Sequence, residues 1–459
     1  MFFLATAINY MDRQALSLTW ETFLAPEYGW DQSDYGAITS IFSLVYAVSM
    51  LYAGKIVDWI GTKAGYTWAL GIWTTGAVLH GFCGIMTSGI ITGEWLVTFD
   101  GARESLYLIG MGGLSISTIS IFLFCTCRVV LSIGQAFNFP SAVKGTAEYF
   151  PKKDRAFAIS IFNTGASVGA LISPLIIPHI ARRIGWEWAF IAVGIIGYAW
   201  MFVWLKTFKK PSESPYVNTH ELNYIEQDGQ DDGETMSIHE TLTYKQTWAV
   251  IVGKFMTDGV WWFFLFWTPA YITETFGYST DSNMGMALIS TLYLITMISI
   301  AGGYLPTLFV DHSRETPYQA RMKAMFIYAI IPLGVIFAQA ASTISPWLMI
   351  TIVGLAGAAH QSWSANLYSI VGDLFPKKAI ATVIGVGGAA GGIGSFILLQ
   401  TTPILFKYAK ATPNFEIFGY EGIDGAYMLI FCFCAVAYLI GWIIMKALVP
   451  TYHSVLEKM

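Results

Sequence analysis

Charged side chains are scarce in this sequence. Aspartate, glutamate, lysine and arginine make up 12% of its 459 residues and 55% of the residues are hydrophobic, whereas about 25% of an ordinary soluble domain is charged. A soluble chain of this composition would lack the polar side chains to cover its surface. The lysines and arginines are scattered along the chain rather than gathered into one patch, which argues against nucleic acid as a partner.

Cysteine is scarce as well, and nucleotide-binding motifs are missing. The five cysteines all fall within apolar stretches, so we expect small apolar side chains rather than disulfides or a zinc site. The string GGAAGGIG at 387–394 follows no predicted strand, which favours close helix packing over phosphate binding, and no Walker-type string for an ATP-driven pump occurs. The sequence therefore predicts no enzyme activity, no cofactor and no metal.

Long apolar runs, by contrast, are abundant. A membrane-spanning helix needs about 20 apolar residues, and a weaker run at 1–24, interrupted by Asn9, Asp12 and Arg13, adds a twelfth candidate to eleven clear ones. Residues 1–24 lack the basic leader and the cleavage site of a signal peptide. The pattern predicts an all-α polytopic membrane protein with twelve transmembrane helices. The clear runs are 36–57, 66–87, 106–131, 155–180, 187–205, 248–272, 284–310, 322–341, 346–371, 379–406 and 426–448.

The distribution of basic residues predicts the orientation. With the N-terminus inside, most lysines and arginines fall in inside loops, in agreement with the positive-inside rule. Both termini are then expected to be cytoplasmic. The basic residues left in outside loops are Arg103, Arg182, Arg183, Lys407 and Lys410.

One short string occurs twice, as EYFPKKDRAFA at 148–158 and DLFPKKAIATV at 373–383. Aligning the copies also pairs Gly169 with Gly394, and both copies lie between two predicted spans on the inside. The duplication predicts two pseudo-symmetric six-helix halves, 1–206 and 248–459, joined by a cytoplasmic linker at 207–247 with a short amphipathic helix near 219–227. Two such halves form a cavity near the bilayer midplane that opens to alternate sides.

The loop GKIVDWIGTK at 54–63 resembles a signature of the major facilitator superfamily through Gly54, Asp58, Gly61 and Lys63, although Trp59 stands where the pattern usually has arginine. An ordinary turn is the alternative. The resemblance implies a gating role, because glycine lets helices approach closely and the aspartate binds a basic side chain or a helix N-terminus in one conformation.

A narrower resemblance covers nearly the whole chain. The strings INYMDRQALS at 8–17, NFPSAVKGTAEYFPKKDRAFA at 138–158, GKFMTDGVWWFFLFWTPAYI at 253–272 and GAAHQSWSANLYSIVGDLFPKK at 357–378 are similar to the anion:cation symporter family, and in particular to its bacterial hexuronate and sugar-acid transporters. This resemblance implies the bacterial inner membrane as the location. Segment 88–115 looks like an insertion between the third and fourth spans, on the outside.

Ionisable residues within predicted spans indicate the site. A charge at the centre of a span costs roughly 2.5–3.5 kcal/mol, so it usually faces a cavity or a partner. Asp12, Arg13 and Arg128 leave a surplus positive charge, which suits an anionic substrate, and the planar fork of arginine binds both oxygens of a carboxylate. The alternative is a buried Asp–Arg lock without substrate contact. Lys254 and Asp258, four residues apart, are expected to pair within their helix rather than bind substrate.

The resemblance further implies that Asp12 carries the proton and Arg13 the substrate, with help from Tyr10. It also implies a second titrating carboxylate in the run SIGQAFNFP at 132–140, where this sequence has Gln135. Glutamine does not titrate, so we expect proton coupling to be weakened or to use fewer protons, unless Gln135 is itself an engineered change. In the mechanism expected here, a substrate carboxylate takes over an arginine from Asp12 and thereby favours its protonation.

Other polar side chains are candidates for binding sugar hydroxyl groups. On the tenth span His360, Trp363 and Ser364 are expected to share one helix face, and Trp261 and Trp262 on the seventh span line the cavity or face lipid. The full set of polar candidates is Tyr46, Asn163, His360, Gln361, Trp363, Ser364 and Asn366.

Together these features predict a monomeric secondary transporter for proton-coupled symport of a hexuronate such as galacturonate or glucuronate. Its partners are a small organic anion, protons and the lipid bilayer. The alternatives are an uncoupled facilitator, a coupling-impaired variant, and a non-transporting receptor on a transporter fold.

Overall fold

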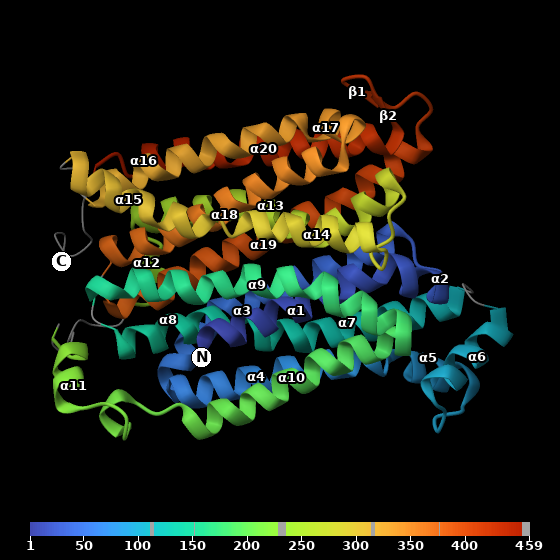
Figure 1. Cartoon of the computed structure of the whole chain (residues 1–459), viewed down its shortest axis with the longest axis horizontal. Coiled ribbons are helices and arrows are strands. Elements are labelled where there is room, and N and C mark those ends of the chain that lie inside the picture. Colours follow the sequence, from blue (N-terminus) through green and yellow to red (C-terminus); the bar gives the residue numbers. More distant parts are fainter. Residues whose placement is uncertain (111–113, 151, 228–235, 314–316, 376, 452–459) are drawn as a thin grey trace.

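The chain folds almost entirely into helices that run along the long axis of the molecule (Figure 1). The computed structural model describes residues 1–110, 114–150, 152–227, 236–313, 317–375 and 377–451. The side chains of Asp58 and of the duplicated lysines Lys152, Lys153, Lys377 and Lys378 lie outside the described part.

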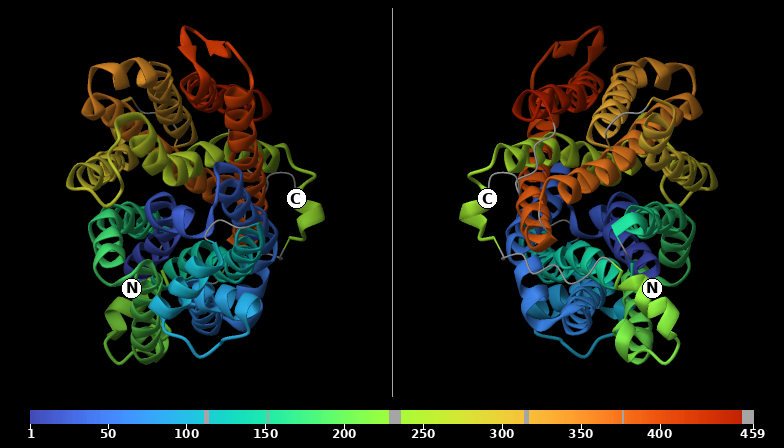
Figure 2. Two further views of the ribbon diagram at one scale, coloured as in Figure 1. Left: turned by 90° about the vertical axis from the view of Figure 1, so that its right-hand side faces the viewer. Right: turned by 90° about the vertical axis from the view of Figure 1, so that its left-hand side faces the viewer.

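The helices form two groups that lie side by side in Figures 1 and 2. The first helix group comprises α1 (Phe2–Thr19), η1 (Trp20–Leu24), α2 (Ala25–Tyr28), α3 (Gln32–Ile60), α4 (Thr62–Gly81), α5 (Cys83–Thr92), α6 (Phe99–Gly110), α7 (Leu114–Ala136), α8 (Asn138–Tyr149), α9 (Lys152–Ile184) and α10 (Trp186–Thr207). The connecting segment holds η2 (Pro211–Glu213), α11 (Thr219–Ile225) and α12 (Ile238–Thr241). The second helix group comprises α13 (Lys245–Phe276), α14 (Asn283–Thr296), α15 (Ser299–Ser313), α16 (Pro317–Ile330), η3 (Ile331–Phe337), α17 (Ala338–Ile344), α18 (Pro346–Leu374), α19 (Lys377–Ala411) and α20 (Gly422–Leu448), with a small hairpin of β1 (Glu416–Ile417) and β2 (Tyr420–Glu421).

Nine of the described helical segments are long and apolar enough to cross a membrane, and α4 with α5, bent by 54° at their junction, makes a tenth if the pair is one span. The long helices α1 and α18 pack in the same bundle and carry more polar residues. This arrangement is compatible with the predicted twelve spans and establishes a multi-pass membrane protein. The fourth span begins later than expected, because α6 takes up part of the run at 106–131.

The two copies of the repeated string have the same local structure. In the first copy α8 ends at Tyr149 and α9 begins at Lys152, and in the second α18 ends at Leu374 and α19 begins at Lys377. Farther along, Gly169 and Gly394 both lie against the backbone of a neighbouring helix, so closely that a side chain carbon would overlap a carbonyl oxygen. The repeat therefore marks equivalent positions in the two helix groups.

The expected linker helix is α11, which begins with an N-cap from Asn218. It lies at one end of the bundle, here called the α11 end, on the left of Figure 1. The insertion folds into the end of α5 and into α6, which project at the opposite end, here called the α6 end. Across the boundary between the groups, α3 packs on α19 and α9 packs on α14.

Candidate functional site

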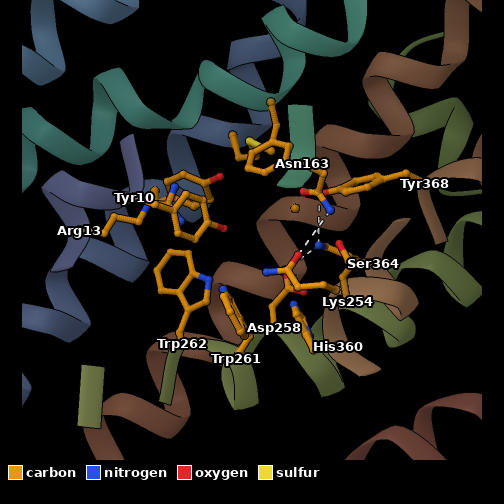
Figure 3. Close-up of a pocket in the computed structure, with 15 residues that line it drawn as sticks. Tyr10, Arg13, Asn163, Lys254, Asp258, Trp261, Trp262, His360, Ser364 and Tyr368 are labelled. Atoms are coloured by element: carbon orange, nitrogen blue, oxygen red, sulfur yellow. Dashed lines mark hydrogen bonds and ion pairs between the residues drawn. The ribbon is translucent and has the colours of Figure 1, made fainter. Parts of the chain in front are cut away.

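A small central cavity lies between the two helix groups (Figure 3). Its volume of about 40 Å³ has room for only a few water molecules, so a larger molecule enters only if the helices separate. The residues that line it are Tyr10, Arg13, Tyr46, Met50, Phe139, Asn163, Lys254, Asp258, Trp261, Trp262, His360, Gln361, Ser364, Tyr368 and Gly388.

Arg13, on α1, is buried in this wall in an aromatic surrounding. Its guanidinium carbon lies 4.9 Å from the ring centres of both Tyr10 and Tyr46 and 5.2 Å from that of Trp262. A guanidinium over aromatic faces is stabilised without losing its charge. The arrangement keeps a permanent cation at the cavity.

Gln135, on α7, fixes the orientation of this arginine. Arg13 Nε donates to Gln135 Oε1 at 2.8 Å, and Gln135 Nε2 donates to the carbonyl oxygen of Asn9 at 3.2 Å. Among the described atoms, Arg13 Nη2 has no hydrogen-bond partner. Since glutamine is neutral, it holds the arginine without cancelling the charge that an anion would bind.

Asp12 and Arg128 lie outside the lining of the cavity. Both side chains are buried, each acts electrostatically on the other, and neither lines the cavity. Arg128 also lies 5.6 Å from the ring centre of Phe42. No ion pair joins the two side chains in the described structure: Asp12 Oδ2 and all three guanidinium nitrogens of Arg128 are buried without a hydrogen-bond partner among the described atoms. The alternative of a buried Asp–Arg lock is therefore not formed in this conformation, and substrate contact of Arg128 stays a prediction.

Lys254 and Asp258, on α13, form the expected pair within one helix, with Nζ and Oδ2 2.8 Å apart. Lys254 Nζ also donates to the hydroxyl of Tyr368 at 3.2 Å. Both charged side chains line the cavity, which the sequence interpretation did not expect. Figure 3 shows them across from Arg13 and Tyr10.

Helix α18 contributes several of its candidate residues to the cavity. Gln361, Ser364 and Tyr368 line the cavity together with His360, whereas Trp363 is fully buried behind them against Tyr438, with ring centres 5.8 Å apart. His360 and Trp363 both contact Tyr438 on α20, in agreement with the predicted common face, but Trp363 does not line the cavity in this conformation. Asn366 also lies outside the cavity, and its Nδ2 donates to the carbonyl oxygen of Ser362 at 2.9 Å.

A hydrogen bond joins the two groups at the cavity. Asn163 Nδ2 on α9 donates to Gln361 Oε1 on α18 at 3.4 Å. Nearby, His360 Nδ1 lies 2.8 Å from the Tyr438 hydroxyl, and the ring of Trp261 stacks on His360 with centres 5.3 Å apart. These amide, hydroxyl and imidazole groups are the kinds of side chain that bind sugar hydroxyl groups.

At the α6 end a set of contacts holds the groups together. Arg182 on α9 forms an ion pair with Asp281 at 2.9 Å, the Thr280 hydroxyl donates to the carbonyl oxygen of Leu18 at 2.9 Å, and the Tyr35 hydroxyl donates to that of Phe266 at 2.7 Å. The cavity is therefore closed toward the α6 end in this conformation.

The candidate gating residues lie at the junction of α3 and α4. Gly61 has φ of 84°, a conformation that favours glycine, and Gly54 is buried one turn before Asp58. Lys63 is exposed, and its carbonyl oxygen accepts from Trp204 Nε1 at 3.3 Å. The junction is thus a tight turn. A gating motif and an ordinary turn both predict this geometry.

The structure adds cavity residues that the sequence interpretation missed. Tyr368 continues the face of Gln361 and Ser364 by one turn, a spacing visible in the sequence once the face is known. Phe139 stacks on Tyr368 with ring centres 6.2 Å apart. The sequence left open whether Trp261 and Trp262 line the cavity or face lipid, and both line the cavity.

A bundle of two structurally equivalent helix groups, with a charged polar cavity between them, defines a membrane transporter rather than an enzyme. Residues 2–399 match the model of the Major Facilitator Superfamily. The chain belongs to this superfamily, as the motif at 54–63 led us to expect.

Relatives of known sequence are similar over most of their length. The hexuronate transporter of Escherichia coli strain K12 is 25% identical over 93% of this chain and 91% of its own. A probable galactarate/D-glucarate transporter of Bacillus subtilis strain 168 is 26% identical over 91% of this chain and 86% of its own. The galacturonate transporter of Dickeya chrysanthemi is 23% identical over 72% and 87%.

Solved structures show the same fold. The E. coli xylose transporter XylE, in a partially occluded inward-open conformation, superposes with a TM-score of 0.67 at 13% identity over 98% of this chain and 96% of its own. A bacterial homologue of the human lysosomal transporter Spinster, in an inward-facing and unoccupied conformation, superposes with a TM-score of 0.65 at 16% identity. The match covers 99% of this chain and 97% of that one.

Proposed function

We propose that this chain is a proton-coupled symporter of a carboxylated sugar, a hexuronate such as galacturonate or glucuronate. The observation that carries the proposal is Arg13, a cation held at the central cavity by the neutral Gln135. The transporters of hexuronate, galacturonate and galactarate or glucarate among its relatives support the substrate class.

In the proposed binding mode, the substrate carboxylate accepts hydrogen bonds from the Arg13 guanidinium. The sugar hydroxyl groups bind Asn163, Gln361 and Ser364, and the apolar face of the ring packs on Trp262. Since Asn163 and Gln361 come from different groups, substrate bound between them holds both sides of the cavity. Alternating access then follows from rocking of the two groups around the site.

The proposed proton site is Asp12, whose charge is balanced by Arg128. Protonation of Asp12 removes its electrostatic attraction to Arg128 on α7, which lets the groups rearrange. The proposed orientation places both termini in the cytoplasm of a bacterium, with the α11 end inside and the α6 end outside the inner membrane, in agreement with the lysine and arginine distribution.

The test is uptake of labelled D-galacturonate into proteoliposomes with and without an inward proton gradient. We expect gradient-driven accumulation by this chain, and exchange without accumulation by Asp12→Asn. Accumulation by Asp12→Asn would contradict the role of Asp12, and absence of galacturonate flux would overturn the proposed function in favour of a receptor role.

A facilitator without proton coupling is the second candidate, and Gln135 favours it because glutamine does not titrate. Gln135→Glu distinguishes the two in the same assay. Exchange without accumulation in this chain, with accumulation restored by glutamate at 135, would identify a facilitator.

A further inference from the structure

The cavity contains an acidic side chain that the proposed mechanism does not use. Among the residues that the structure describes, Asp258 is the one carboxylate lining the cavity. Its Oδ2 pairs with Lys254, and its Oδ1 is buried without a hydrogen-bond partner among the described atoms. A buried carboxylate oxygen without a partner is costly in its charged form.

The charges around the cavity are therefore two cations and one anion. Arg13 belongs to the first helix group, and Lys254 and Asp258 belong to the second. An entering substrate carboxylate meets Arg13 free of any acidic partner in the described structure, but it meets Lys254 already paired. Access to Lys254 thus depends on the charge of Asp258.

We propose that Asp258 is a proton-binding residue that controls whether Lys254 can bind an oxygen of the substrate. One proton from solvent adds to the Asp258 carboxylate, the ion pair breaks, and the Lys254 ammonium keeps its charge and donates to a substrate oxygen instead. This inference rests on the proposed transport of a sugar acid. It gives the cavity two cationic binding groups for the substrate, Arg13 for the carboxylate and Lys254 for another oxygen, on opposite helix groups.

The surroundings of Asp258 suit such an exchange. The charged and titratable groups that face the pair are Lys254 on its own helix, Arg13 on α1, His360 and Tyr368 on α18, and Tyr438 on α20. None of these is a second carboxylate. Asp258 is therefore the single acidic side chain among them that competes with the substrate for Lys254.

Helix α19 connects the charge of Asp258 to helix packing. Gly391 lies directly against the carboxylate, so that a side chain carbon at 391 would overlap Oδ2. When Asp258 turns away from Lys254, this contact must change. Proton binding is therefore coupled to the spacing of α13 and α19, and α19 also packs on α3 of the first group.

The test is the number of protons taken up when D-galacturonate binds to the purified chain. Calorimetry in buffers of different ionisation enthalpy, repeated from mildly acidic to mildly alkaline pH, gives both this number and the pH dependence of the affinity. Asp258→Asn should lower the uptake by about one proton and flatten the pH dependence accordingly. At alkaline pH its affinity should exceed that of the parent chain, because Lys254 is then no longer paired with a carboxylate.

Matched variants separate this role from a structural one. Asp258→Glu should restore the proton uptake, and Asp424→Asn, an exposed carboxylate on α20, should leave it unchanged. If Asp258→Asn does not fold, the neutral pair Lys254→Met with Asp258→Asn avoids an unpaired buried charge. This double variant should bind about tenfold more weakly or worse, again with about one proton fewer.

An unchanged proton count in the folded variants overturns the role of Asp258 while leaving symport intact. Failure of the parent chain to accumulate galacturonate under a proton gradient overturns symport instead. Proton uptake on binding is measured without a membrane, so the two failures are distinguishable.

Discussion

At the scale of single residues, the two membrane-embedded arginines have different surroundings. Arg13 is oriented by Gln135 and borders the cavity, whereas Arg128 faces Asp12 and the ring of Phe42. We therefore expect Arg13 to bind substrate and Arg128 to act electrostatically on Asp12. Their substitution should separate substrate binding from the proton-dependent rearrangement.

Arg13→Lys should weaken D-galacturonate binding by about ten- to a hundredfold, because lysine cannot keep both the bond to Gln135 and a fork for the carboxylate. This corresponds to about 1.5–3 kcal/mol for one charged hydrogen bond. Arg128→Lys is the matched control and should leave the binding constant nearly unchanged. Equal losses of affinity in the two variants would contradict the assignment of Arg13 to the cavity.

Glu27 at the α6 end predicts a pH effect on stability. Burial raises its pKa above the ordinary value of 4.5, although Trp186 and Arg103 oppose the shift. The folded chain then binds this proton more tightly than the unfolded chain, so this contribution to stability is present at low pH. It is lost as pH rises from the unfolded pKa through the folded one.

Glu27→Gln removes that titration. In thermal unfolding scans, the parent chain should gain stability relative to the variant as the pH is lowered through this window. A difference in melting temperature that stays constant with pH would show that Glu27 does not titrate in this way.

At the scale of helices, the apolar runs and the duplicated string were sufficient to predict the bundle and its repeat. They could not predict the rotation of each helix, because that depends on packing partners distant in sequence. Trp363 turned toward Tyr438, and Lys254 with Asp258 turned toward the cavity. The sequence could single out Arg13 and Gln361, which line the cavity, because arginine and glutamine are unusual in an apolar span.

The paired glycines predict which helix contacts tolerate least change. Gly169→Ala and Gly394→Ala should each destabilise the protein by about 1–3 kcal/mol, because a methyl group would push a carbonyl oxygen of the neighbouring helix away. Gly303→Ala is the control, since no atom lies within 4 Å of a carbon added there. Thermal unfolding in detergent measures the three variants, and equal stability would contradict the close-contact explanation.

At the scale of the whole molecule, contacts between the groups at the α6 end close the cavity on that side. The hydroxyl oxygens of Thr22 and Thr280 are 3.3 Å apart across this boundary. The sulfur atoms of cysteines at both positions would lie close together, so that a small movement of the groups lets them form a disulfide. This provides a reversible way to hold the observed conformation.

Thr22→Cys combined with Thr280→Cys should stop galacturonate uptake after oxidation, and a reducing agent should restore it. Each single variant serves as a control for effects of the substitution alone. Full uptake by chains whose cross-link is complete would show that the α6 end does not need to open during transport.

The Arg103 cluster has a practical consequence. Arg103 on α6 pairs with Glu27 and Glu187, at 3.3 and 2.7 Å, and with Asp100 at 3.1 Å, and all three partners belong to the first helix group. The projecting α6 is thereby fastened to one side of the carrier. An antibody fragment raised against it would give electron-microscopy particles a recognisable landmark, and would leave the second group free to take up any position.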